Sequence, residues 1–222
     1  MDLNIRDNDG INNARELLSP TQYLLPGFMS GSGGDFVNRV IMEIENSILK
    51  PPLEDIENSS EGILEGLAEN MNIEKPRIMT TINPPINECL EYIDKDQQCQ
   101  LIMGKYFADE SVILINYKFD MNTLLHLFAH HVHAIEMGRT KYVRVRKLEE
   151  LRLPWQLRPT EIMAMHRTAH LVRILSPRAW RIYNEEIKPR IRDIEEKISN
   201  VRLTVSYLEK QVEHTFNEKR HI

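Results

Sequence analysis

The chain has 222 residues, of which 41% are hydrophobic and 27% are charged, a balance typical of a soluble globular protein. Its 28 basic and 33 acidic residues give a net charge of −5, which argues against a surface built throughout for nucleic acid. No apolar run reaches the roughly 20 residues that a membrane-spanning helix needs, and the acidic start is unlike a secretory leader. We therefore expect a cytoplasmic protein with no membrane partner.

The first 58 residues are predicted to form an acidic arm. Residues 1–60 carry ten acidic and four basic side chains, a net charge of −6. Apolar residues recur three and four apart between Phe36 and Pro51, which predicts one amphipathic helix that ends at the two prolines. A second helix is predicted to start near Ser59 or Ser60 and to reach Met71.

A small sheet is predicted next, with strands at 77–82, around 100–107 and at 111–117, where apolar and β-branched residues gather. Two cysteines, Cys89 and Cys99, are too few for a disulfide framework. We expect reduced thiols, although a bond between them is the alternative in an oxidising setting.

Residues 187–222 are predicted to form a long helix with a heptad pattern. Its apolar positions, four and three apart, are Ile187, Ile191, Ile194, Ile198, Val201, Val205, Leu208 and Val212. This pattern predicts either a two-stranded coiled coil between copies or a helix packed on its own domain or on the helix after residue 34. Association through residues 187–215, as a homo-oligomer or with a protein partner, is therefore expected.

Two histidines four residues apart form the first candidate site. His126 and His130 fall within a helix predicted at 121–137, so their imidazoles project from one face and can converge on one cation. The same spacing also suits histidines that line a polar groove or form hydrogen bonds in the core. Spacing alone leaves both interpretations open.

The order of these residues resembles the gluzincin zinc metallopeptidases, particularly the small soluble ones. In that family a strand precedes a helix with the pattern His-Glu-x-x-His, and a later helix supplies a glutamate as the third zinc ligand. His126 and His130 match the two imidazoles, Glu161 after Arg158-Pro159 matches the glutamate, and Ala164 matches a small residue that follows it. The resemblance covers roughly residues 60–185. It implies a zinc cofactor, a zincin-like sheet, an active-site helix and a glutamate helix.

One position departs from the family pattern, because Leu127 replaces the glutamate that acts as the general base. Leucine can neither accept nor donate a proton, so we assign no catalytic residue. The metal ligands are unaffected by this change. Glu136 and His131 are candidate substitute bases, but neither is expected on the metal-binding side of the helix.

Other histidines are accessory candidates. They are His131, His133, His166 and His170. About 10 Å of helix rise separates His126 from His133, too far for one ion to reach both together with His130. His166 and His170 are four apart and share a helix with Glu161, which leaves a second site or an altered ligand set open.

The segment 139–158 is basic, with a net charge of +5. Alternating residues at 141–146 predict a short strand or hairpin with basic side chains on one side. Its candidate contacts to a polyanion are Arg139, Lys141, Arg144, Arg146 and Lys147. A solvated face, or pairing with the acidic arm, explains the same charges without a ligand.

Together these observations predict an α+β fold that is predominantly helical, with an arm at 1–58, a gluzincin-like domain at 59–186 and a long helix at 187–222. We expect a zinc-binding, catalytically impaired relative of a metallopeptidase that acts as a scaffold or interaction protein. The alternatives are a structural, assembly or nucleic-acid-associated protein that uses the coiled coil and basic hairpin without metal, and an active peptidase with a substitute base.

Overall fold

The computed structural model describes residues 34–82, 86–91 and 97–219, with side chains at 47–82 and 103–201 and at Leu203 and Tyr207. Its helical elements are α2 (Gly34–Met71), α3 (Met121–Met137), α4 (Arg139–Arg152), a 3-10 turn η2 (Trp155–Leu157), α5 (Pro159–Ile174), α6 (Pro177–Arg181), a π-helical turn η3 (Ile182–Ile187) and α7 (Lys188–Lys219). Its strands are β1 (Arg77–Thr81), β2 (Ile86–Glu91), β3 (Gln97–Ile102), β4 (Gly104–Phe107) and β5 (Val112–Asn116). The fold is α+β and predominantly helical, as predicted.

A three-stranded sheet holds the strands predicted at 77–82 and 111–117. Its order is β1-β5-β4, with β1 parallel and β4 antiparallel to β5. The strand predicted around 100–107 is divided, because β3 leaves this sheet and pairs with β2 in a separate antiparallel ladder. β2 was not predicted. Its register places Cys89 opposite Cys99.

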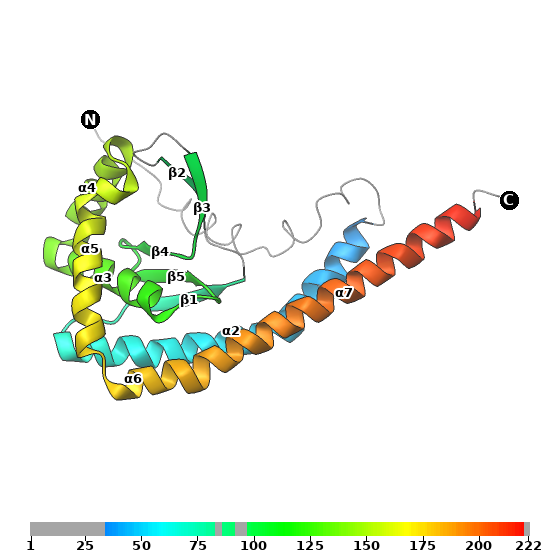
Figure 1. Ribbon diagram of the computed structural model, residues 1–222, viewed down its shortest axis with the longest axis horizontal. Coiled ribbons are helices and arrows are strands. Elements are labelled where there is room, and N and C mark those ends of the chain that lie inside the picture. Colours follow the sequence, from blue (N-terminus) through cyan, green and yellow to red (C-terminus); the bar gives the residue numbers. More distant parts are fainter. Residues whose placement is uncertain (1–33, 83–85, 92–96, 220–222) are drawn as a thin grey trace.

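Helix α3 links the sheet to the helical layer. It lies against β4 and β5, α5 packs on α3, and α2 runs along β1 (Figure 1). The centre of the core is apolar and fully buried at Phe119, Leu124 and Phe128. α3 is therefore held on both sides, which fixes the direction in which its histidines project.

Helix α2 is continuous where the sequence predicts two helices. It runs through Pro51 and Pro52, which the prediction placed at a helix end. A proline inside a helix removes one hydrogen bond and crowds the preceding turn. The buried side nevertheless continues through Leu49, Pro52 and Ile56, and this packing maintains the helix across the prolines.

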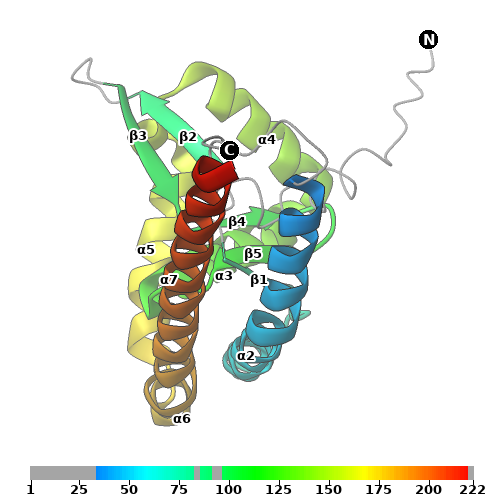
Figure 2. The ribbon, with the colours of Figure 1, turned by 90° about the vertical axis from the view of Figure 1, so that its right-hand side faces the viewer.

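Helix α7 runs antiparallel along α2, and the pair extends away from the sheet (Figures 1 and 2). Ile194 is fully buried, and Ile191 and Ile198 pack against the same core. Arg190 Nε also lies 3.2 Å from Asp55 Oδ2 of α2. The first part of the heptad pattern thus packs on the helix after residue 34. A coiled coil between copies stays a prediction for the remainder.

The segment at 139–152 is helix α4, so the short strand or hairpin predicted at 141–146 is wrong. Short alternating runs cannot by themselves distinguish a strand from a helix. The helix brings Tyr142, Arg146 and Glu149 to one side, and their contacts with α3 and α5 decide the conformation. Within the described residues, no helix combines the length and apolar character needed to cross a membrane.

We expect Ile194→Ala to lower the free energy of unfolding by about 2 to 5 kcal/mol, because it leaves a cavity between α7 and the core. Urea unfolding followed by circular dichroism measures this change. Leu203→Ala on the same helix is the matched control, since Leu203 is 68% exposed. Equal stability losses in the two variants would contradict the packing of α7 on α2.

Candidate metal centre

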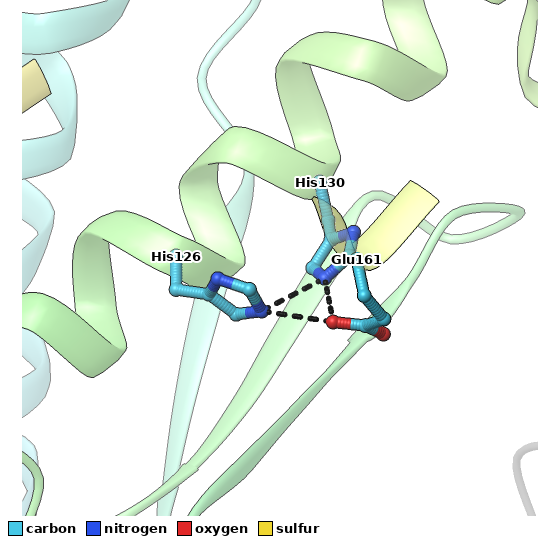
Figure 3. Close-up of side chains that lie close together, drawn as sticks. All are labelled: His126, His130 and Glu161. Atoms are coloured by element: carbon cyan, nitrogen blue, oxygen red, sulfur yellow. Dashed lines mark hydrogen bonds and ion pairs between the residues drawn. The ribbon is translucent and has the colours of Figure 1, made fainter. Parts of the chain in front are cut away.

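Two helices supply the three candidate ligands. α3 starts after Asp120, whose carboxylate accepts a hydrogen bond from the backbone N–H of Thr123 at 2.7 Å. One and two turns further on, α3 presents His126 and His130 on the same face. Glu161 lies in the first turn of α5, and its carboxylate points toward both imidazoles (Figure 3).

The three ligand atoms form a nearly equilateral triangle. His126 Nε2 lies 3.1 Å from His130 Nε2 and 3.1 Å from Glu161 Oε2. His130 Nε2 lies 3.2 Å from the same carboxylate oxygen. Atoms at this spacing could all bind one ion at the usual zinc–ligand distance of about 2 Å. The donor set and its spacing therefore fit a zinc ion.

Two of the three candidate ligands, His130 and Glu161, are buried, and the negative charge of Glu161 is paired with the positive charge of Arg146. Glu161 and His130 are 2% and 4% exposed, whereas the side chain of His126 is 23% exposed. Burial alone would raise the pKa of Glu161, but hydrogen bonds with both histidines and the charge of Arg146 outweigh burial and hold this pKa well below its usual value. Burial lowers the pKa of His130 to about 4. A carboxylate and neutral imidazoles are the forms that bind a metal.

Helix α4 contacts His130 and Glu161 through the side-chain atoms that do not belong to the triangle. Tyr142 Oη lies 2.7 Å from His130 Nδ1, the ring nitrogen that faces away from the triangle. If Nε2 binds a metal, Nδ1 carries the proton of the imidazole and donates a hydrogen bond to the Tyr142 hydroxyl oxygen. Burial raises the pKa of the Tyr142 phenol above its usual value, so the phenol stays neutral. The hydrogen bond fixes both the ring orientation and the tautomer of His130.

Arg146 and Glu149 tie α4 to the start of α5. A close ion pair joins the Arg146 guanidinium to Glu161 Oε1, the carboxylate oxygen that does not face the histidines. The buried Glu149 carboxylate accepts a hydrogen bond from the backbone N–H of Thr160 at 3.3 Å, and a second bond from the Thr160 hydroxyl. A negative charge at a helix N-terminus is stabilising. The turn that carries Glu161 is therefore held at both its backbone and its side chain.

The side chain of Leu127 extends from α3 toward the edge strand β4. It is 5% exposed, and a Cβ atom at Gly104 would overlap its Cδ1 and come within 3.1 Å of the Leu114 carbonyl oxygen. The glycine thus leaves the space that the leucine fills. An apolar contact occupies the position where the family pattern has a carboxylate.

The two candidate substitute bases are engaged elsewhere. Glu136 forms two hydrogen bonds with Arg167 of α5, at 2.7 and 2.9 Å. His131 Nε2 lies 2.6 Å from the Glu74 carbonyl oxygen, and its Nδ1 lies 3.0 Å from Tyr106 Oη. Neither side chain contacts the triangle.

The accessory histidines do not join the group. Among the described residues, His126, His130 and Glu161 are the set of three whose ligand atoms lie close enough for one ion. His133 is 3% exposed and its Nδ1 has no hydrogen-bond partner within the described part of the chain. His166 and His170 are exposed on α5.

Sequence reasoning selected the three residues that the structure brings together, but it missed the residues of α4 that hold them in place. Tyr142 received no role, and Arg146 was considered only as a contact to a polyanion. Neither is marked by a local motif, because each reaches the site through the packing of α4 on α3 and α5. Of the other basic candidates, Arg139 pairs with Glu74, and Lys141, Arg144 and Lys147 show no such pairing within the described residues.

Comparisons with protein-family models, with curated proteins and with solved structures find no match for this chain.

We expect Tyr142→Phe to weaken zinc binding by roughly 10- to 100-fold, because His130 Nδ1 loses its partner. Competition with a chromophoric chelator measures the affinity. Tyr183→Phe is the matched control, since it removes a buried hydrogen bond to the Phe119 carbonyl oxygen at 3.2 Å, outside the site. An equal effect of both substitutions would contradict the assigned role of Tyr142.

Proposed function

We propose that this chain is a gluzincin-like protein that binds one zinc ion through His126, His130 and Glu161, with impaired peptidase activity and a role as a scaffold or interaction protein. The observation that carries the proposal is the triangle of two imidazole nitrogens and one carboxylate oxygen, with sides of 3.1 to 3.2 Å.

The donor chemistry favours zinc. Imidazole nitrogens with a single carboxylate are common ligands of zinc, whereas calcium and magnesium prefer oxygen donors. Arg146 neutralises the carboxylate oxygen that faces away from the triangle, which favours binding of Glu161 through one oxygen and leaves a fourth position for water. Bound zinc would lower the pKa of that water toward about 7.

Impaired catalysis follows from Leu127. A general base is typically worth about 10² to 10⁴ in rate, and the side chain that would supply it here is apolar and buried. An active peptidase with a substitute base is a weaker proposal, because Glu136 and His131 are held by other groups. The ion would therefore serve mainly to join α3 to α5.

An assembly function is the second candidate. Leu203 and Tyr207, four residues apart on α7, are 68% and 62% exposed. They lie beyond the part of α7 that packs on the core, and apolar side chains at this spacing form one patch on a helix. This patch supports association through α7, either between copies or with another protein.

We expect the purified protein to contain one zinc ion per chain, and His126→Ala or Glu161→Ala to lose it. Metal content is measured by mass spectrometry and stability by thermal unfolding. At a zinc concentration about 1,000 times the dissociation constant, the ion should add about 4 kcal/mol to the free energy of unfolding. The variants should lack this gain.

His170→Ala is the matched control for this experiment, because it removes an exposed histidine from α5 outside the triangle. Wild-type protein that neither contains zinc nor gains stability when zinc is added would contradict the ligand assignment. So would a variant of His126 or Glu161 that retains the full zinc content.

We expect peptidase activity of the zinc-loaded wild type to lie at background, and Leu127→Glu to raise it, because glutamate restores a proton acceptor beside His126. Cleavage of a fluorogenic peptide library measures the rate. Leu127→Gln is the control, since it has a similar shape and no basic carboxylate. Rapid wild-type cleavage that a chelator abolishes would contradict impaired catalysis.

A further inference from the structure

Helix α4 has an outer face that the metal centre does not use. Its inner side carries Tyr142, Arg146 and Glu149, which contact α3 and α5. Apart from Thr140 and Glu150, the exposed residues of α4 are Lys141, Arg144, Lys147, Leu148, Leu151 and Arg152, and we call this set of six the outer face of α4.

The outer face carries four positive charges and no compensating acid. Within the described residues, none of its lysines and arginines forms a hydrogen bond or an ion pair. The two carboxylates of α4 are committed elsewhere, because Glu149 is buried against Thr160 and Glu150 lies 3.5 Å from Arg146. Among the residues that the structure describes, the outer face is therefore a cationic surface without neutralising carboxylates.

Two leucines lie in the middle of these cations. Leu148 is 50% exposed and Leu151 is 82% exposed. Arg144, Leu148 and Leu151 follow one another at four and three residues, so they form a single strip along the helix, flanked by the other cations. A helix face that combines protruding leucines with unpaired lysines and arginines has the composition of an interfacial helix.

We propose that the outer face of α4 docks reversibly on an anionic lipid bilayer, with its lysines and arginines at the lipid phosphates and Leu148 and Leu151 in the headgroup region. A bilayer surface uses both kinds of side chain at once. A nucleic-acid backbone would pair with the cations but leave the leucines in water. Two copies of α4 would repel each other, because each carries the same four charges.

The expected affinity is modest. Each lysine or arginine near an anionic surface contributes about fivefold, and the two leucines together about tenfold. Together these contributions raise the affinity for an anionic bilayer roughly 6,000-fold over that of a helix face without them. The prediction of no membrane partner rests on the absence of a membrane-spanning segment in the sequence. Binding to the surface of a bilayer does not require such a segment.

Co-sedimentation of the full chain with vesicles tests the proposal. Vesicles of phosphatidylcholine and phosphatidylglycerol should bind the protein at low salt, and vesicles of phosphatidylcholine alone should not. Lys141→Gln combined with Arg144→Gln and Lys147→Gln should weaken binding roughly 100-fold. Leu148→Ser combined with Leu151→Ser should weaken it roughly tenfold at equal charge.

Matched controls use exposed residues on other helices. Arg173→Gln, Arg181→Gln and Arg192→Gln together remove three charges, and Ile174→Ser removes an exposed apolar side chain from α5; both should leave vesicle binding unchanged. Equal loss in the control and α4 variants would overturn the proposal. Absence of vesicle binding would also overturn it, as would tight duplex DNA binding that the Leu148/Leu151 double variant leaves unchanged. Circular dichroism confirms that each variant is folded.

Discussion

Glu161 is the residue on which the arrangement of the helices around the candidate site depends. One carboxylate oxygen lies close to two histidines of α3 and the other pairs with Arg146 of α4, while Glu161 itself lies in the first turn of α5. Such a buried charge is tolerated only when it is paired and hydrogen-bonded. The three helices must therefore keep their mutual positions, or leave an acid in the core without partners.

This constraint also explains why α4 is a helix. Tyr142 and Arg146 are four residues apart and Glu149 is three further on, which places all three on one side only in a helical conformation. A strand at 141–146 would put Tyr142 and Arg146 on one face as well, but it could not extend to the contact of Glu149 with Thr160 in the same direction. The prediction of a hairpin failed because the deciding contacts are with distant residues.

The sequence supports the fold class and the ligand set more firmly than their surroundings. Spacing on one helix and the order of the residues along the chain single out His126, His130 and Glu161, and the structure brings these three side chains together. Helix α2 continues through Pro51 and Pro52 because Leu49 and Ile56 on either side pack in the core. The residues next to the prolines do not indicate this packing in the sequence. The supports from α4 are likewise invisible until its packing is known.

Helix α4 gives one short segment two unlike faces, and this division has a physical cause. Arg146 forms an ion pair with Glu161 on the inner side, whereas Arg144 and Lys147, two and one residues away along the chain, point to solvent because the helix turns about 100° per residue. The basic residues of 139–152 thus differ in their contacts: Arg146 is partly buried and pairs with Glu161, Arg139 pairs with Glu74, and the others are exposed. Counting the charges as one patch would merge two separate roles, and only the helical period separates them.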